Sequence, residues 1–417
     1  MIASCTAADV AYLVGNQVLV IARKNFRLLL CLMNLCMSGA YAESVATTER
    51  IVPPTTLVRI GVAAPLSGQI AHLGKAISRG VSLAVEQANE ASRVTAAAGV
   101  RFELVEQDDG ADPRRAVAAA TALIDRGVVA VVGHLNSGLS IPASRIYAAH
   151  GVAMVTPASS NPNLTEQGLS NVFRVVARDD MQPAALLEVA RQEGIKRIAI
   201  LAERGSYGDI VSSAAAVQSD SSPVRVVLTE TGLIPDVTAI RSLGERLSNL
   251  ELDGVLVIGS GDLLAAVIKT TAEANSKPLR ILATDYACGD GPFVLPIRPH
   301  RVICSSPDPE IALIDEKFVQ TYLRKFGEKP HPYAATAYDA ASLIVHAARI
   351  AASANPADIA LRLRLTSYSG VTGSISFDKR GDRVGAPILL SEIVDGKTQL
   401  KYVVQNGKLS TVQRTTD

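Results

Sequence analysis

The sequence predicts an α/β protein of two doubly wound lobes, and three observations support this fold class. Short runs of β-branched and other apolar residues alternate with helical segments in two successive series. Short strands separated by helices form parallel sheets with right-handed crossovers. The chain has 417 residues, more than one core usually organises, and 48% of them are apolar while 19% are charged. We therefore expect a well-buried protein with two lobes.

The first 42 residues are predicted to be a secretory signal peptide. Basic residues up to Arg27 precede an apolar run over residues 28–37, and small residues follow at Ala40 and Ala42. These are the three parts of a secretory signal, so we expect cleavage after Ala42 and a periplasmic location. The apolar run is too short to span a bilayer comfortably, and it lacks the amphipathic pattern of the alternative, a buried core helix.

The first series of strands and helices begins at Leu57. Its first helix has apolar residues at three- and four-residue steps. Asp112 and Pro113 mark the start of the next helix, because Asp caps helix N-termini and Pro suits the first turn. We expect strands over residues 57–65, 100–109, 128–133 and 152–157, and helices over residues 72–91, 112–127 and 140–151.

The second series follows the same alternation and ends in a different pattern. Its tail is rich in Gly and Asp between short apolar runs, which is typical of antiparallel hairpins. We expect parallel strands over residues 196–203, 223–230, 253–259, 279–284 and 300–306, and hairpin strands over residues 373–382, 386–396 and 400–407. Helices are expected over residues 181–194, 207–218, 311–327 and 333–352, with others between the strands.

Charge and motifs argue against several function classes. Lys and Arg number 41 against 40 Asp and Glu, so the net charge of +1 gives no case for nucleic acid or an anionic membrane. The chain contains neither a GxSxG nor an HExxH motif. "VVGHLNSGLS" resembles a phosphate-binding loop, but Leu139 and Ser140 stand where that loop has Lys and then Ser or Thr. We therefore expect neither an enzyme nor a bound cofactor.

Two polar groupings invite a catalytic interpretation that the sequence does not support. His134 lies near Ser137, but no third residue can be assigned to orient the ring, so a solvated or capping histidine is the favoured interpretation. Asp108 and Asp109 could be an acid pair or metal ligands. A turn-forming cluster with Asp112 is the favoured alternative.

Small polar residues follow two strands of the first series. They are Asn136 and Ser137 in one loop and Ser159 and Ser160 in the other. Ligands bind at the carboxyl ends of parallel strands, so these side chains should share one edge if the strands are neighbours. Both loops precede predicted helix starts, whose free N–H groups attract an anion, and without Lys the site suits a single carboxylate. The alternative is that Ser137 and Ser160 only cap helices.

Only two cysteines lie beyond the predicted signal peptide, Cys288 and Cys304. In an oxidising compartment they could form a disulfide, or they could remain two buried thiols. The chain has no CxxC spacing, so a zinc site is not expected.

From Leu57 to about Lys397 the chain resembles the periplasmic leucine/isoleucine/valine-type binding proteins, the amino-acid receptors of ABC importers. The most specific pattern is "GHLNSG", "PASRIY", "MVTP" and then "NPNLTEQG", and "IAILAERGSYG" and "GVTGSISFDKRGD" add to it. The resemblance implies two Rossmann-like lobes, joined by three hinge crossings, that close on a ligand as in type I periplasmic binding proteins. The lobes would comprise residues 57–177 with 308–370, and residues 178–307 with 371–413.

The resemblance also implies a function. The protein would be a monomer that binds an amino acid, branched-chain or otherwise apolar, between its lobes. An inner-membrane ABC permease would read the closed form, which the ligand stabilises by its differential affinity. The alternative is a ligand-sensing module of the same fold, which regulates a partner instead of feeding a permease.

Five ligand-binding roles are carried over by the resemblance. Ser137 in "GHLNS" would hold the ligand carboxylate, and the backbone carbonyl of Ala158 would accept from its ammonium. Ser160 would contact the amino-acid backbone. Tyr207 in "GSYG" would close over the ligand, and Asp285 after "LRILAT" would pair with the ammonium. This set suits a zwitterion, which needs donors at one end and acceptors at the other.

The chain departs from the family pattern at positions expected to line the cleft. Leu73 and Gly261 stand where the branched-chain receptors carry aromatic residues, and Asp285 replaces a Glu. Ala111 and Asn136 stand where some members have a disulfide. The cleft is therefore expected to be roomier, for a larger apolar or aromatic amino acid or for a carboxylate without an amino group.

Overall fold

The computed structural model describes residues 13–14, 17–18, 56–94, 99–274, 278–289 and 300–412. By its contacts the chain divides into two units, residues 1–52 and 53–417. In the first unit, β1 (Leu13–Val14) pairs antiparallel with β2 (Gln17–Val18). The predicted signal peptide with its cleavage site otherwise lies outside the described residues.

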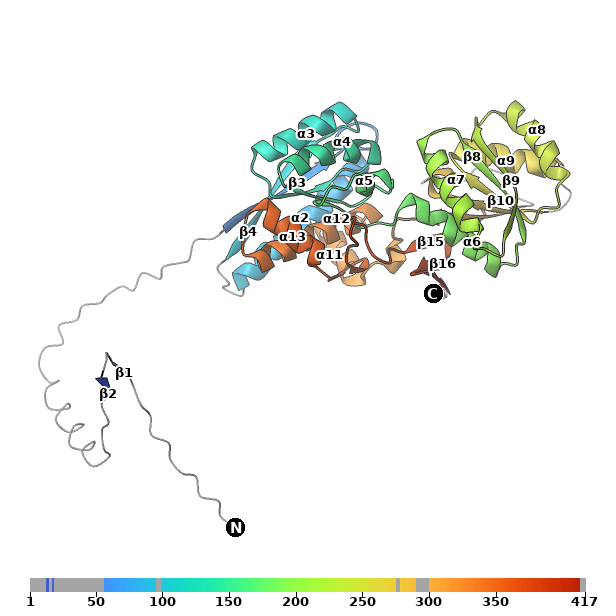
Figure 1. The fold of residues 1–417 in the computed structure, drawn as a ribbon. Coiled ribbons are helices and arrows are strands. Elements are labelled where there is room, and N and C mark those ends of the chain that lie inside the picture. Colours follow the sequence, from blue (N-terminus) through green and yellow to red (C-terminus); the bar gives the residue numbers. More distant parts are fainter. Residues whose placement is uncertain are drawn as a thin grey trace, which may run out of the picture. The chain divides into compact units, whose positions relative to one another are not determined.

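The first lobe is built on a parallel sheet of five strands in the order β4-β3-β5-β6-β7 (Figure 1). Because β3 lies between β4 and β5, the strand order reverses there, as in doubly wound folds. The strands are β3 (Thr56–Ala64), β4 (Val100–Asp108), β5 (Ala130–Gly133), β6 (Ala153–Thr156) and β7 (Val172–Arg174).

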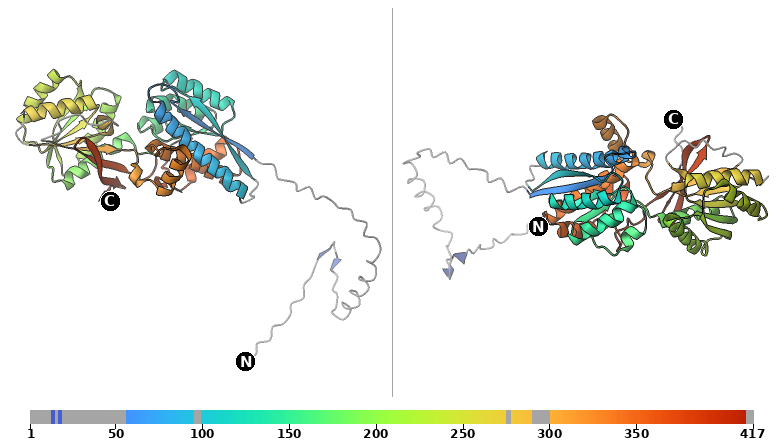
Figure 2. Two further views of the ribbon diagram at one scale, coloured as in Figure 1. Left: turned by 180° about the vertical axis from the view of Figure 1, so that it is seen from behind. Right: turned by 90° about the horizontal axis from the view of Figure 1, so that it is seen from above.

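Helices cover both faces of this sheet because its strands bury alternate residues on opposite sides. Val132 contributes to the core under α2, α12 and α13, while its neighbour Val131 packs with α3 and α4. The helices are α2 (Ala71–Val94), α3 (Pro113–Asp125), α4 (Ser137–Ala149), α5 (Asn163–Glu166), α11 (Glu316–Phe326), α12 (Pro332–Ala351) and α13 (Pro356–Leu365). Figure 2 shows α2 beside the orange C-terminal helices of this lobe.

The second lobe repeats the arrangement and extends it. Its sheet has the order β17-β16-β15-β12-β11-β10-β8-β9, in which β8 to β12 are parallel and β15 to β17 are antiparallel. The strands are β8 (Arg197–Glu203), β9 (Arg225–Leu233), β10 (Gly254–Ile258), β11 (Arg280–Ala283), β12 (Arg301–Ser306), β15 (Ile388–Val394), β16 (Lys397–Gln405) and β17 (Lys408–Thr411).

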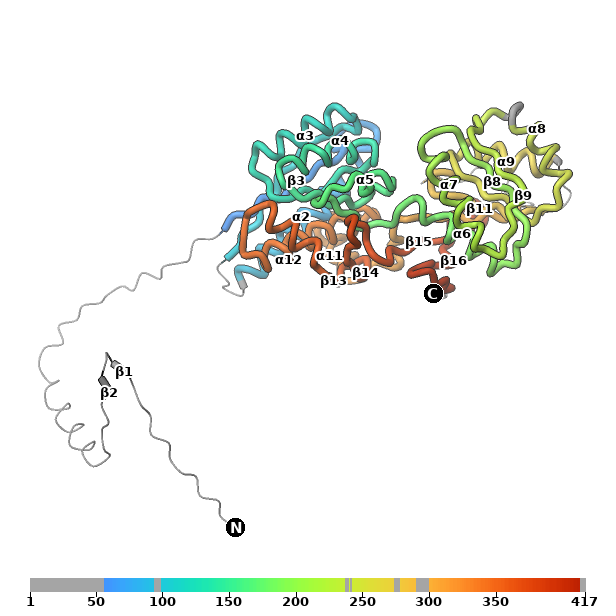
Figure 3. The backbone as a smooth tube through the Cα atoms, viewed as in Figure 1, coloured from blue at the N-terminus to red at the C-terminus, as the bar shows by residue number. Residues whose placement is uncertain are grey.

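The helices of this lobe also lie on both faces. Ile200 and Leu256 pack with α6 and α7, whereas Leu201 and Val257 pack with α8 and α9. The helices are α6 (Gln182–Gln192), α7 (Ser206–Ser219), α8 (Val237–Ser248), α9 (Gly261–Ala274), α10 (Asp285–Cys288) and the short turn η2 (Asp179–Met181). A second short turn, η3 (Ile311–Leu313), packs with α11 and α12 of the first lobe. The predicted class of two doubly wound lobes is confirmed, and Figure 3 traces the chain through both.

Local signals explain where several helices begin and end. The Asp112 carboxylate accepts from the N–H groups of Arg114 and Arg115, both at 2.9 Å, and caps α3 as predicted. Asp315 accepts from the N–H of Phe318 at 3.0 Å, so α11 begins there. The single helix predicted over residues 311–327 is therefore a short turn followed by a separate helix. Helix α13 was not predicted.

One predicted lobe boundary does not match the contacts. Residues 371–383 were assigned to the second lobe, but Ile375 lies in the core of the first lobe. The Asp382 carboxylate accepts from Nε of the fully buried Arg174 at 2.9 Å and from Nη1 of Arg178 at 3.1 Å. Hairpin signals predict pairing between adjacent strands, but not which core the hairpin packs on. The chain enters the second core only near Ala386.

This hairpin consists of two short strands near the end of the first-lobe segment. They are β13 (Tyr368–Gly370) and β14 (Gly373–Ile375), which pair antiparallel. The buried Asp339 carboxylate of α12 accepts from the N–H groups of Val371 and Thr372 at 2.7 and 2.9 Å. These bonds hold the hairpin turn against α12.

Candidate functional site

The two small polar loops of the first lobe lie at one edge of its sheet, as predicted. Strands β5 and β6 are hydrogen-bonded neighbours, so the loops after them meet. Ser137 begins α4 and is half-buried, and its Oγ accepts from the N–H of Asn161 at 3.2 Å. Ser159 is buried; its hydroxyl donates to the carbonyl of Leu135 at 3.1 Å and lies 2.6 Å from Oγ of Ser140. The loops are thus bonded directly to one another.

The remaining predicted residues of the first lobe differ in exposure. Ala158 and Ser160 are half-buried, and the Ser160 carbonyl accepts from the N–H of Asp179 at 3.0 Å. Asn136 is exposed and makes no side-chain cap on α4. Leu73 is half-buried and packs against the first-lobe core from α2. Asn136 occupies the N-cap position of α4 without a side-chain hydrogen bond to the helix, and Ser137 accepts from Asn161 outside α4. The backbone of Ser160 connects its loop to the first crossing.

His134 is fully buried, so the prediction of a solvated or capping histidine is wrong. Its Nδ1 lies 2.8 Å from the Asp109 carboxylate, and its Nε2 lies 3.2 Å from the Tyr147 hydroxyl. The second ring nitrogen therefore contacts a tyrosine and not a serine. The His134 carbonyl accepts from the Thr156 hydroxyl at 3.1 Å. These contacts hold the two loops in place, because they connect β4, β5 and β6 beneath them.

The Asp108 and Asp109 pair makes turn contacts, in agreement with the favoured interpretation. Asp108 accepts from the N–H groups of Gly110 and Leu66, both at 2.8 Å, and Asp109 accepts from the N–H of Ala111 at 3.0 Å. Hydrogen bonds and the nearby Arg115 lower the pKa of Asp108 to about 2, although its partial burial alone would raise it. The carboxylate stays ionised and connects its turn to the loop after β3.

In the second lobe, Asp285 and Tyr207 are brought together from different strand ends. Asp285 follows β11 and begins α10, and Tyr207 lies in the first turn of α7, after β8. The Tyr207 hydroxyl donates to the Asp285 carboxylate at 2.6 Å. Gly261 begins α9 after β10. The three positions therefore follow three adjacent parallel strands of one sheet.

A second carboxylate, Asp179, was not predicted as a site residue. Together with Asp285 and Tyr207 it forms what we call the acidic cluster. Asp179 lies in η2 at the first crossing and is only 5% exposed. Burial, and then the negative charge of Asp285, raise its pKa to about 7, while a hydrogen bond from Ser160 lowers it. Burial also raises the pKa of Asp285. The sequence signal for this residue is the acidic pair Asp179 and Asp180, which follows the predicted lobe boundary at residue 177.

Gln182 joins the two carboxylates and was also missed. Its side chain is fully buried at the start of α6, and its amide lies 2.8 Å from the Asp285 carboxylate and 3.3 Å from that of Asp179. Gln182 and Asp285 are separated by 103 residues. No spacing in the sequence could have indicated this contact.

An exposed aromatic residue lies beside the acidic cluster. Tyr286 directly follows Asp285 and is 59% exposed, and its ring centroid lies 5.6 Å from that of Tyr207 in an edge-on arrangement. Tyr286 therefore supplies a large aromatic side chain in this region, where Gly261 has no side chain of its own.

Cys288 and Cys304 form a disulfide in the structure, with Cα atoms 6.1 Å apart. Cys288 is the last residue of α10, whose first residue is Asp285, and Cys304 lies in β12. The bond therefore ties the short helix that carries Asp285 to a neighbouring strand.

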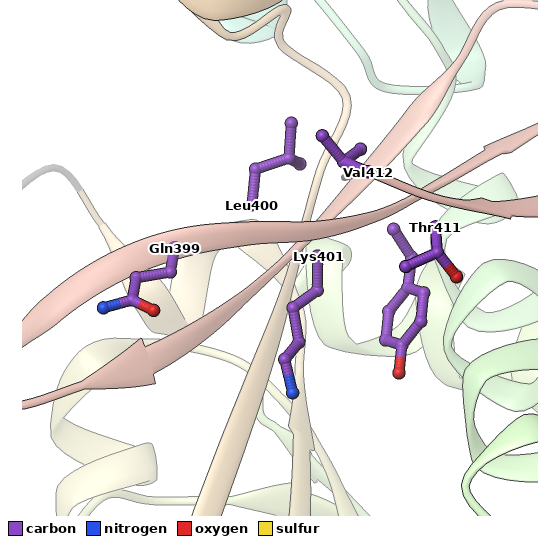
Figure 4. Close-up of a pocket in the computed structure, with 6 residues that line it drawn as sticks. Gln399, Leu400, Lys401, Thr411 and Val412 are labelled. Atoms are coloured by element: carbon purple, nitrogen blue, oxygen red, sulfur yellow. The ribbon is translucent and has the colours of Figure 1, made fainter. Parts of the chain in front are cut away.

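Other features of the described residues do not suggest a competing site. A pocket at the β16–β17 edge belongs to the antiparallel extension, away from the carboxyl ends of the parallel strands (Figure 4); it is lined by Gln399, Leu400, Lys401, Tyr402, Thr411 and Val412. Within the described ranges no group of three or more His, Cys, Asp or Glu is arranged to hold a metal ion. No helix in those ranges is long and apolar enough to cross a membrane.

Comparisons with known proteins agree with this architecture. A sequence model of the periplasmic binding protein family matches residues 57–398. The Leu/Ile/Val-binding protein homolog 2 of Brucella abortus (strain 2308) is 31% identical over 352 residues, covering 80% of this chain and 90% of that protein. The leucine-, isoleucine-, valine-, threonine-, and alanine-binding protein of Pseudomonas aeruginosa is 27% identical over 338 residues, covering 78% of this chain and 87% of that protein.

A solved structure shares both lobes. An ABC transporter substrate-binding protein from Desulfitobacterium hafniense, in complex with Leu, has a TM-score of 0.68 and 27% identity to this chain, with 82% of this chain and 99% of that chain covered. The family match extends from the first strand of the first lobe to β16 in the second. The chain therefore belongs to the periplasmic binding protein family.

Proposed function

We propose that this protein is the extracytoplasmic receptor of an ABC importer and that it binds a free amino acid through its α-ammonium and α-carboxylate. The observation that carries the proposal is the pair of buried carboxylates Asp179 and Asp285, which share the side-chain amide of Gln182 as a hydrogen-bond partner. Burial raises the pKa of both, and the negative charge of Asp285 raises that of Asp179 further. Such a pair binds a proton or a cation readily, because either one relieves the repulsion and the cost of burial.

An ammonium fits this position better than a carboxylate does. Asp285, Asp179 and Tyr207 would surround the ammonium in the closed protein, with the Ala158 carbonyl as a further acceptor. A ligand that has only a carboxylate would add a third negative charge to the pair. The alternative of a carboxylate without an amino group is therefore disfavoured.

The first lobe would hold the other end of the ligand. Ser137 lies in the first turn of the thirteen-residue helix α4, where the helix dipole and free N–H groups favour an anion. We assign Ser137 and Ser160 to the ligand carboxylate, with Ser159 as the residue that holds the two loops together. Leu73 and Gly261, which are smaller than the aromatic residues of the family pattern, leave room for an apolar side chain, beside which Tyr286 supplies an aromatic surface.

The relatives support this choice of ligand class. The Brucella abortus and Pseudomonas aeruginosa proteins are named for binding branched-chain and other small amino acids, and the Desulfitobacterium hafniense protein was crystallised with Leu. By analogy, the protein would act as a periplasmic monomer that closes on its ligand and delivers it to an inner-membrane permease. Cleavage after Ala42 would accompany export, so N-terminal sequencing of the exported protein should begin at Glu43.

A ligand screen by thermal shift tests the proposal. A ligand that binds only the folded state raises its melting temperature. We expect apolar L-amino acids to raise it, and we expect their 2-oxo acids and benzoate, which lack the amino group, to leave it unchanged. Stabilisation by the carboxylates alone would overturn the amino-acid assignment.

Uptake of the identified ligand by cells that lack this gene would then separate a transport receptor from a sensor of the same fold, because only loss of the receptor abolishes uptake.

A further inference from the structure

Gln182 occupies the centre of the acidic cluster. It is the first residue of α6 and directly follows η2, the turn that carries Asp179. Its side chain is fully buried. A buried amide that lacks hydrogen-bond partners is costly, so the contacts of this side chain determine what it can do.

The orientation of the amide follows from its partners. The backbone N–H of Asp285 can only donate, and it lies 3.1 Å from Oε1, which also accepts from the Ser305 hydroxyl at 2.6 Å. The oxygen therefore lies on that side, and Nε2 points to the carboxylates. Nε2 donates to Asp285 at 2.8 Å and to Asp179 at 3.3 Å. One side chain thus connects the first crossing, the end of β11 and β12.

A neutral amide has a property here that no charged side chain shares. It donates to both carboxylates and holds them in place, yet it leaves their negative charge uncompensated. A lysine or arginine at this position would neutralise the pair from within and compete with an external cation. A glutamate would add a third carboxyl group to the cluster.

We infer that Gln182 is a positioning residue for the ligand ammonium, holding Asp179 and Asp285 together in the ionised form that an amine-bearing ligand requires. The inference rests on the proposed function. It assigns amine selectivity to the whole cluster rather than to Asp285 alone.

The surroundings of the pair are consistent with this role. Hydrogen bonds from Gln182 lower the pKa of both Asp179 and Asp285, against the larger effect of burial. Three other groups also face them. Tyr207 donates to Asp285, while a side-chain hydrogen bond from Ser160 and the positive charge of Arg174 lower the pKa of Asp179. Arg174 is already paired with Asp382. Gln182 carries no charge, so it donates to both carboxylates without neutralising them.

The test is the pH profile of amino-acid affinity in Gln182→Met. The probe is leucine if leucine stabilises the wild type in the screen, and otherwise the amino acid that stabilises it most. Losing a hydrogen bond to a charged group should weaken binding at pH 7.5 roughly 10- to 100-fold. Losing both donors should also move the midpoint of the profile to higher pH. A purely structural role would lower the melting temperature of the unliganded protein without moving that midpoint.

Gln218→Met is the matched control, because Gln218 also bonds the first crossing but through a backbone carbonyl, that of Asp180, at 2.8 Å. It should leave both affinity and midpoint unchanged. Gln182→Glu preserves size and covers the case in which Gln182→Met does not fold; its midpoint should move to higher pH, because a third carboxyl group raises the pKa of the pair. If either folded Gln182 variant keeps the wild-type affinity and midpoint, the inference is wrong. If the wild type binds no amino acid, the proposed function fails instead.

Discussion

The two lobes have the same strand order at their parallel cores but opposite chemistry at the ends of those strands. The order β4-β3-β5-β6-β7 in the first lobe matches β9-β8-β10-β11-β12 in the second. The first lobe presents serine hydroxyls and a helix N-terminus, whereas the second gathers Asp285, Tyr207 and Gln182, joined by Asp179 from the first crossing. The fold positions loops at strand ends in both lobes, and the residues in those loops decide which charge each lobe can bind.

This division matches the two ends of a zwitterion. The neutral loops suit a carboxylate, and the acidic cluster suits an ammonium. Each substitution below changes one lobe and leaves the other intact, so that the proposed division can be tested in either half.

The largest effect is expected from Asp285→Ala. Removing one partner of a buried charge pair costs about 2–5 kcal/mol, so amino-acid affinity should fall roughly thirty- to several-thousand-fold. Calorimetric titration with the identified ligand measures the loss. Asp220→Ala, at an exposed position that ends α7, is the control and should bind as the wild type does. Wild-type affinity in Asp285→Ala would remove the second lobe from ammonium recognition.

The second effect is a pH dependence that arises from the acidic cluster. The pKa of Asp179 is raised from 3.8 to about 7, so the unliganded folded protein holds a proton more tightly than the unfolded chain. Its stability should therefore fall as pH rises from about 4 to 7. An ammonium ligand displaces this proton, so affinity should increase with pH, up to about 100-fold between pH 5 and pH 8.

Calorimetry in two buffers of different ionisation enthalpy checks this directly. Proton release should accompany binding at pH 6 and vanish near pH 8.5. Proton uptake, or an affinity that does not change with pH, would contradict the assignment of the ammonium to Asp179 and Asp285.

A smaller effect is expected from Ser137→Ala in the first lobe. Losing one hydroxyl donor to an anion should weaken binding roughly tenfold, while the free N–H groups of α4 remain. The same change should leave the pH midpoint untouched, because the acidic cluster is intact. Ser213→Ala is the control, because Ser213 is exposed and its hydroxyl donates to the Asp209 carbonyl within α7. A shifted midpoint in Ser137→Ala would show that the lobes do not act separately.

The smallest effect on affinity is expected from removing the disulfide. Replacing Cys288 and Cys304 with Ser opens a loop of 16 residues and should lower the unfolding free energy by about 3 kcal/mol in the chain-entropy model. Affinity should change only a few-fold, because Tyr207 and Gln182 still hold Asp285. Chemical denaturation and titration measure the two effects. Two free thiols in the native, unreduced protein would show that the bond does not form.

The sequence by itself determined the fold class and half of the site. Alternating apolar runs and helical segments required two doubly wound sheets, and small polar residues after β5 and β6 marked the first-lobe loops, because their positions follow from local pattern and strand order. The resemblance located Asp285 and Tyr207 in the same way, since each lies directly after a recognisable strand. These features depend on residues that are close in the chain.

Only the tertiary structure decided which side chains meet. His134 looked like an isolated loop histidine until β4 brought Asp109 to its ring, and the hairpin at residues 373–382 carried no signal for the lobe on which it packs. Asp179, Gln182 and Asp285 come from segments up to about a hundred residues apart. The charges of the two carboxylates interact because folding brings them together and buries them. Burial and proximity are properties of the packed chain, so the acidic cluster could not be recognised from residue types and spacing.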